Sequence, residues 1–418
     1  MVLATDDRAG GIWVPGSPED SSRKPTAQEL IDLRTQATTY FQTFHSQCAE
    51  EDNYYLGKRK IAIPENMGIE PVWPATASAI INVATDHVDV NNLAIDVPSS
   101  PRSRARAERI KKFLIGTWMG VKKPVLRTAV RHSFLYGTAF LKDMFDPMKW
   151  PDAPLADDFG SDGDFREAMQ DFMEARGIKF PLVTESVSPK NLLWDDSKTR
   201  MKWVIETQER SARAIEDAYP EWTPRSANGA AETEGIVWSE YWDDTWVAYM
   251  ADDDLVWGPE KHGYGTHPYS QIFPLNAHTF DDGPPEERFR GILHPVHSLL
   301  DEEARVLAQV DSILRSVAWR TIDIHGPPAV ADKLKDEYQL FGGINVIPPG
   351  VTVEASPMAQ VPPDLWRTLE VLQNKIEQAT FPNVVRGIRP TGASSGFEVS
   401  VLAGMGRLVF QGIADGTR

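Results

Sequence analysis

The chain has 418 residues, 41% hydrophobic and 25% charged, which is the composition of a folded protein with two or three structural regions. Sixty acidic residues against 43 basic ones give a formal net charge of −17, which argues against a general nucleic-acid-binding protein with a basic face. Cys48 is the single cysteine, so the composition excludes an intrachain disulfide and a cysteine-based zinc site.

The first 25 residues are rich in Gly, Pro, Ser and Asp without periodicity, which indicates a flexible arm. They lack the basic and apolar regions of a signal peptide. The chain contains no run of about 18 apolar residues, so we expect no membrane-spanning helix. Thr26 and Glu29 match a capping box, which predicts the start of a helix. Its apolar face follows at helical spacing: Leu30, Leu33, Ala37, Phe41 and Phe44.

From 75 to 145 the pattern predicts three helices, at 75–88, around 103–118 and around 124–136, and then a strand after Gly137. A polar insertion at 150–180 predicts a loop and a short helix. Short β-branched and aromatic runs between 181 and 280, such as PLVTESVSPKNLLWD, predict antiparallel strands with hairpins at acidic turns. The fold class is therefore α+β.

Residues 292–320 form one long helical pattern, and 29 helical residues span about 43 Å. A compact stretch with two Pro-Pro pairs follows, in which strand runs alternate with turns. A second helix then carries a narrow apolar seam at Leu365, Leu369, Leu372, Ile376 and Ala379. This seam predicts packing between neighbouring helices, either between subunits or within one chain.

Residues 386–396 read RGIRPTGASSG and contain the G-x-S-x-G pattern of a serine-hydrolase nucleophile, centred on Ser394. That nucleophile needs a buried apolar strand before it, whereas a proline and two arginines precede it here. It also needs a later histidine, and none follows Gly396. We therefore interpret the segment as a glycine-rich loop, in which Arg386 and Arg389 either contact a phosphate backbone or form salt bridges in solvent.

Other candidate sites have simpler explanations. His294 and His297 could share a helix face, but no third ligand pattern lies near them in the sequence, so we expect no metal site. The acidic pairs match neither an EF-hand nor a nuclease cluster, and no phosphate-binding glycine motif is present. We therefore expect no catalytic residue, no cofactor and no enzymatic activity.

The order of elements resembles the portal (head–tail connector) proteins of tailed double-stranded DNA bacteriophages, over roughly 30–418. RTAVRHSFLYGTAFLKDMFDP (127–147) is similar to the helix–glycine–strand segment of the wing in these proteins, and VSPKNLLWDD (187–196) is similar to a second patch. The helical patterns at 291–320 and 362–380 take the places of the two stem helices. RGIRPTGASSG takes the place of the tunnel loop.

The resemblance implies an α+β portal fold assembled as a cyclic ring. The chain then divides into an arm (1–25), a wing (26–285), stem helix 1 (286–320), a clip (321–358), stem helix 2 (359–382), the tunnel loop (383–398) and the start of a C-terminal wing or crown helix (399–418).

By position, the resemblance implies three sets of functional residues. The tunnel loop would meet DNA through Arg386, Gly387, Arg389, Thr391, Gly392, Ser394, Ser395 and Gly396. The stem would pack through Leu307, Val310, Leu314, Leu365, Leu369, Leu372 and Ile376. The clip would face terminase and adaptor through Lys333, Lys335, Asp336, Glu337 and Tyr338.

The resemblance implies that about twelve copies form a ring at one capsid vertex. This ring would be the channel through which the genome is packaged and ejected, and it would nucleate procapsid assembly. Its implied partners are passing double-stranded DNA, the large terminase subunit, head–tail adaptors, and the major capsid and scaffolding proteins, with no membrane. The ring would assemble in the host cytoplasm and stay in the virion. The net charge of −17 would make such a channel repel DNA phosphates. The alternative explanation of this charge is that it only keeps the protein soluble. The alternatives are another structural virion protein, such as an adaptor or capsid component, and a serine hydrolase using Ser394.

Overall fold

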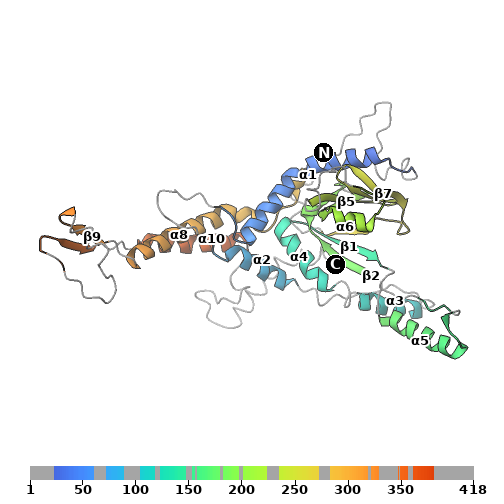
Figure 1. Cartoon of the computed structure of the whole chain (residues 1–418). Helices are drawn as coiled ribbons and strands as arrows, with labels where there is room; N and C mark the ends of the chain where they lie inside the picture. The colour runs from blue at the N-terminus through green and yellow to red at the C-terminus, as the bar shows by residue number, and fades with distance from the viewer. Residues whose placement is uncertain are drawn as a thin grey trace. The chain divides into compact units, whose positions relative to one another are not determined.

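The computed structural model of the protein describes residues 23–60, 72–88, 104–117, 123–146, 153–155, 158–178, 182–196, 201–223, 235–272, 283–318, 322–328, 347, 349–355 and 361–380. These residues form two compact units (Figure 1). The first comprises the described parts of Met1–Leu56 and Ser78–His294, and the second those of Gly57–Ala77 and Pro295–Pro382. The predicted arm, apart from 23–25, lies outside the described residues, as do the tunnel loop and the C-terminal helix.

The capping box predicted at Thr26 is present at the start of α1 (Ala27–Tyr55). The Thr26 backbone N–H and hydroxyl donate to Glu29 Oε2 at 2.8 and 2.9 Å, and the Glu29 N–H donates back to Thr26 Oγ1 at 3.3 Å. The predicted apolar face is buried at Leu30, Leu33, Ala37, Phe41 and Phe44. The predicted helix is therefore confirmed.

The next three predicted helices are also present as α2 (Thr76–His87), α3 (Arg104–Thr117) and α4 (Lys123–Tyr136). Gly137 ends α4 with φ +77°, a conformation that favours glycine. A Cβ at this position would lie 2.3 Å from the Arg290 backbone nitrogen. The chain then enters β1 (Ala139–Phe145) as predicted. Among the residues that the structure describes, the further helices of this unit are α5 (Asp162–Ile178), α6 (Ala212–Ala218) and α7 (Pro285–Arg288).

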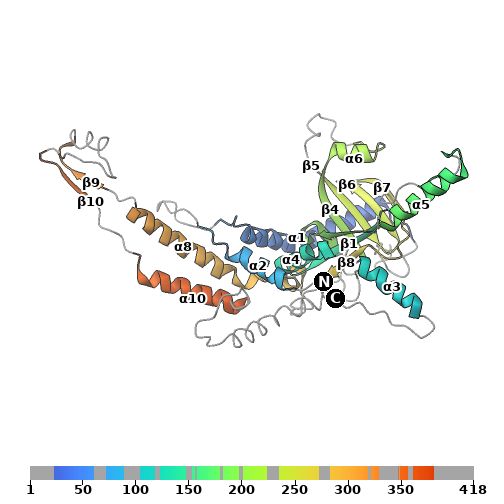
Figure 2. The same cartoon turned by 90° about the horizontal axis from the view of Figure 1, so that it is seen from below.

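The strand-rich region forms two antiparallel sheets in the first unit (Figure 2). One sheet has the order β2–β1–β8 and adds β2 (Leu182–Val187) and β8 (Tyr269–Ile272) to β1. The other has the order β3–β4–β5–β6–β7: β3 (Leu192–Trp194), β4 (Trp203–Ser211), β5 (Gly235–Asp243), β6 (Trp246–Ala251) and β7 (Asp254–Lys261).

The run PLVTESVSPKNLLWD, one of those that predict strands, is divided between these two sheets. The 3₁₀ turn η5 (Pro189–Asn191) separates β2 from β3, because Pro189 has no N–H with which to continue a ladder. The predicted hairpins are confirmed: acidic turns join β5 to β6 and β6 to β7, and both strand pairs are antiparallel.

An aromatic cluster around Trp194 forms the core of the first unit. The Trp194 ring centroid lies 4.2 Å from that of Phe41, 4.8 Å from Phe140, 5.7 Å from Phe44 and 5.8 Å from Phe289. Tilted and edge-on rings at these separations attract one another beyond their simple burial. The cluster therefore fixes α1 against both sheets.

The described residues of the second unit include two long helices and a pair of strands that lies between them in the sequence: α8 (His297–Ala318), β9 (Ile322–His325), β10 (Thr352–Ala355) and α10 (Pro363–Ala379). α8 begins five residues later than the predicted start at 292, because the 3₁₀ turn η7 (His294–Val296) precedes it and contains Pro295. α8 and α10 lie side by side and run in opposite directions (Figures 1 and 2).

Candidate functional site

The pair of helices α8 and α10 contains the residues predicted to pack in the stem. Val310, Leu372 and Ile376 are buried, with exposed fractions of 4%, 9% and 3%. Leu307, Leu365 and Leu369 are partly covered. The seam read from the sequence therefore lies along the contact between the two helices within one chain, except at Ala379, which is exposed at the last residue of α10.

Three large apolar side chains on these helices are exposed in the single chain. Leu314 is 50% exposed, and Trp366 and Val371 are each 51% exposed. Leu314 was expected to pack in the stem, but one partner helix covers only a narrow stripe of α8. Sequence reasoning missed Trp366 and Val371, because both lie off the seam. Together they leave apolar surface available for another protein surface.

The hairpin between the helices forms part of the predicted clip. β9 pairs with β10 from Ile322 opposite Ala355 to His325 opposite Thr352. The predicted terminase- and adaptor-facing residues of the clip lie outside the described residues: Lys333, Lys335, Asp336, Glu337 and Tyr338.

Ion pairs follow α8 within the second unit. Arg59 Nε lies 3.1 Å from Asp301 Oδ1, which connects the segment after α1 to the helix. Arg315 pairs with Asp311 at 2.8 Å, one turn earlier in α8. The Arg315–Asp311 pair is exposed, and an exposed pair contributes roughly 0–1 kcal/mol, whereas the Arg59–Asp301 pair is partly buried.

The tunnel-loop residues predicted from the sequence also lie outside the described residues. This applies to the arginines expected to contact DNA and to the serine of the G-x-S-x-G pattern: Arg386, Gly387, Arg389, Thr391, Gly392, Ser394, Ser395 and Gly396. The rejection of a nucleophile and the expected DNA contact therefore both stay predictions.

Within the first unit, a buried lysine connects the two sheets. Lys142 Nζ on β1 lies 2.8 Å from Glu206 Oε2 on β4 and 3.0 Å from Glu240 Oε2 on β5. Burial lowers the pKa of Lys142, but Glu240 and Glu206 outweigh this effect and the net pKa is raised. The Tyr269 hydroxyl donates to Glu206 Oε2 at 2.7 Å. This charged, hydrogen-bonded group holds the sheets together.

A second polar group connects α1 to α4. The Tyr136 hydroxyl donates to Asp52 Oδ1 at 2.6 Å, and Lys190 forms an ion pair with the same carboxylate. Burial and the hydrogen bond to Asp52 raise the pKa of Tyr136. His132 lies beside this tyrosine, and burial lowers its pKa to about 4. Its imidazole is therefore neutral at pH 7.

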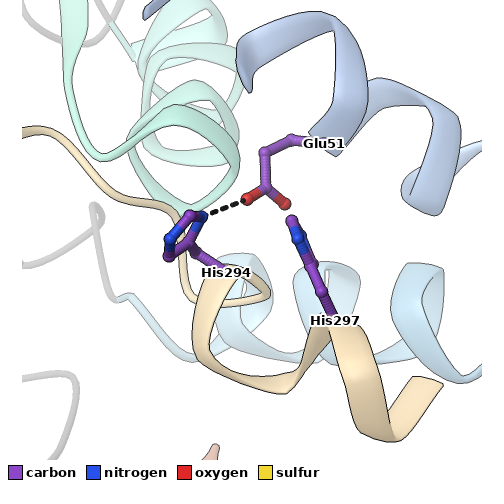
Figure 3. A group of neighbouring side chains, drawn as sticks. All are labelled: Glu51, His294 and His297. Carbon is purple, nitrogen blue, oxygen red and sulfur yellow. Dashed lines mark ion pairs between the residues drawn. The ribbon is translucent and has the colours of Figure 1, made fainter. Parts of the chain in front are cut away.

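Glu51 and His294 form another pair in the first unit. His294 Nδ1 lies 3.8 Å from Glu51 Oε1, and Glu51 is 3% exposed (Figure 3). Figure 3 also shows His297, which begins α8 three residues later. Carboxylate and imidazole are both zinc ligands, but the two first-unit residues alone do not complete a tetrahedral site. Sequence reasoning missed Glu51 as a neighbour of His294, because it belongs to a distant helix.

No protein-family model and no curated protein sequence matches the chain. Among solved structures, one chain from a structure described as "Virion of native gene transfer agent (GTA) particle" is 11% identical to this chain. The match covers 83% of this chain and 82% of that chain, with a TM-score of 0.35. A score at this level does not establish a common fold. Within the described residues, the helices lack the combined length and apolarity required to cross a membrane.

Proposed function

We propose that this chain is the portal subunit of a tailed-phage-like particle, forming a ring of about twelve copies around a DNA channel. In this role it would admit the genome during packaging, release it during ejection and nucleate procapsid assembly. It would bind the large terminase subunit and later the head–tail adaptors through the hairpin region. Its contribution would be structural rather than enzymatic.

The observation that carries the proposal is the order of elements in the second unit. A 22-residue helix leads into a two-stranded hairpin, and a 17-residue helix returns beside the first. This order agrees with the stem–clip–stem sequence that the resemblance implies. The helix α8 would span about 33 Å, which is long enough to line a substantial part of a channel.

Two further properties support a ring. Leu314, Trp366 and Val371 are half exposed on the stem helices, so a neighbouring copy would remove apolar surface from water. The net charge of −17 would make a channel wall repel phosphate, which favours passage of DNA over binding.

Native mass spectrometry and negative-stain imaging of the purified full-length chain test the proposal. We expect closed rings of about twelve 46.7 kDa subunits with a central hole. Assemblies of about twelve subunits that lack a central hole would favour another structural virion protein. A protein that stays monomeric at high concentration would contradict the proposal.

The tunnel loop is tested separately by reversing its charge with Arg386→Glu and Arg389→Glu. We expect packaging to fail while the rings stay intact, because the loop would contact DNA rather than neighbouring subunits. Rings that dissociate would instead show that the arginines are structural.

The hydrolase alternative is tested at Ser394. We expect Ser394→Ala to package normally, and we expect the unmodified chain not to react with a serine-directed phosphonate probe. Covalent labelling of Ser394 would favour the hydrolase.

A further inference from the structure

The helix α3 carries a positive surface on an acidic chain. Its 14 residues include five basic residues and one acidic residue. Arg106, Arg109 and Lys112 follow one another at spacings of three, and all three are exposed. Ile110 and Leu114 on the same helix are 39% and 38% exposed. The helix therefore presents both charge and apolar surface to solvent.

The helix α5 has the opposite charge. Glu167, Asp171 and Glu174 follow one another at spacings of four and three, and all three are exposed. None of the side chains described in this helix is buried, and Met173 is 58% exposed. α5 is thus an acidic helix whose apolar side chains are only partly covered.

Both helices need a packing surface for their stability. Isolated helices of about 15 residues are marginal in water, and most helical stability in proteins comes from packing of an apolar face. In Figure 2, α3 and α5 extend from the sheets of the first unit in different directions. The charged residues named above are exposed on both helices.

We propose that α3 of one copy of this chain binds α5 of a neighbouring copy, with the basic row of α3 against the acidic row of α5. Charge complementarity indicates that the binding partner is a second copy of this chain, because the basic residues of α3 match the acidic residues of α5. The two surfaces differ, so the contact is head-to-tail, and its repetition gives a ring or a filament. The inference rests on the proposed portal function for closure of the ring.

Two charge-reversed proteins test this interface. One carries Arg109→Glu and Lys112→Glu in α3, and the other carries Glu167→Lys and Asp171→Lys in α5. Each alone places like charges on both contacting helices, so we expect its self-association to weaken at least about tenfold at low salt. In an equal mixture, copies of the two variants that alternate place every α3 against an α5 of opposite charge. We expect the mixture to regain assembly, measured by sedimentation velocity and native mass spectrometry.

Two controls separate the interface from general effects of charge and folding. Glu216→Lys with Asp217→Lys reverses two exposed charges on α6 and is expected to leave assembly unchanged. Circular dichroism melts should show that every variant is folded. A protein with all four α3 and α5 reversals should assemble by itself. If it does so while the mixture fails, α3 and α5 pair within one chain and the inference is overturned.

The remaining outcomes distinguish this inference from the proposed function. Rings that withstand each reversal would overturn the α3–α5 interface and leave the portal proposal standing. Filaments that dissociate on reversal and recover on mixing would support the interface but contradict the closed ring. An unmodified chain that does not self-associate would contradict both.

Discussion

Replacement of Lys142 by methionine should destabilise the first unit strongly. The lysine side chain is 8% exposed, and its two carboxylate partners are 15% and 9% exposed. Glu206 lies directly opposite Glu240 in the pairing of β4 with β5, so Lys142→Met would leave two buried carboxylates facing each other. Breaking a buried ion pair by removing one partner costs about 3–5 kcal/mol. We expect a loss of this size in the free energy of unfolding at pH 8, measured in urea.

The pH dependence of this loss identifies its cause. Without the lysine, the two facing carboxylates repel each other in the folded variant, and binding of a proton to either one relieves this repulsion, so a lower pH favours the folded state. The stability lost in Lys142→Met should therefore be partly regained as the pH falls from 8 to 5. Adding Glu240→Gln to this variant should recover stability at pH 8. A loss below about 1 kcal/mol, or an equal loss at both pH values, would refute electrostatic coupling between the sheets.

Three other perturbations test the packing. Leu372→Asp should cost about 3 kcal/mol or more and expose the α10 amides to hydrogen exchange, and unchanged protection would contradict the buried seam. Burial lowers the pKa of His132 from 6.5 to about 4, so the unfolded state binds the proton first as the pH falls. Up to about 3 kcal/mol of stability should be lost across this window, and His132→Phe should reduce this loss in urea titrations at several pH values. Gly137→Ala should lower thermal stability by about 2 kcal/mol or more, whereas Gly160→Ala, with no neighbour within 4 Å of its Cβ, should change it little.

Local signals in the sequence predicted the elements whose causes are local. The capping box at Thr26 fixed the start of α1, and the glycine after α4 marked the turn into β1. The acidic turns between aromatic runs predicted the hairpins of the five-stranded sheet. The seam of α10 also predicted Leu372 and Ile376 as buried residues. Each prediction depends on residues within one or two turns of one another.

The division of the strands between two sheets was decided by the tertiary structure. β1 lies between β2 and β8, although these strands come from distant parts of the chain. Sequence periodicity gives the faces of a strand but not its partner. The Trp194 cluster and the Lys142 group depend on the same long-range pairing, so neither was predicted.

The sequence by itself determined the α+β class, most helix boundaries, the acidic balance and the order of elements on which the proposed function rests. These properties depend on composition, periodicity and capping, which act over short stretches of chain. Only the tertiary structure decided which charges meet in the interior and which apolar side chains stay exposed. Both are set by contacts between distant segments, and burial decides whether such a charge requires a partner.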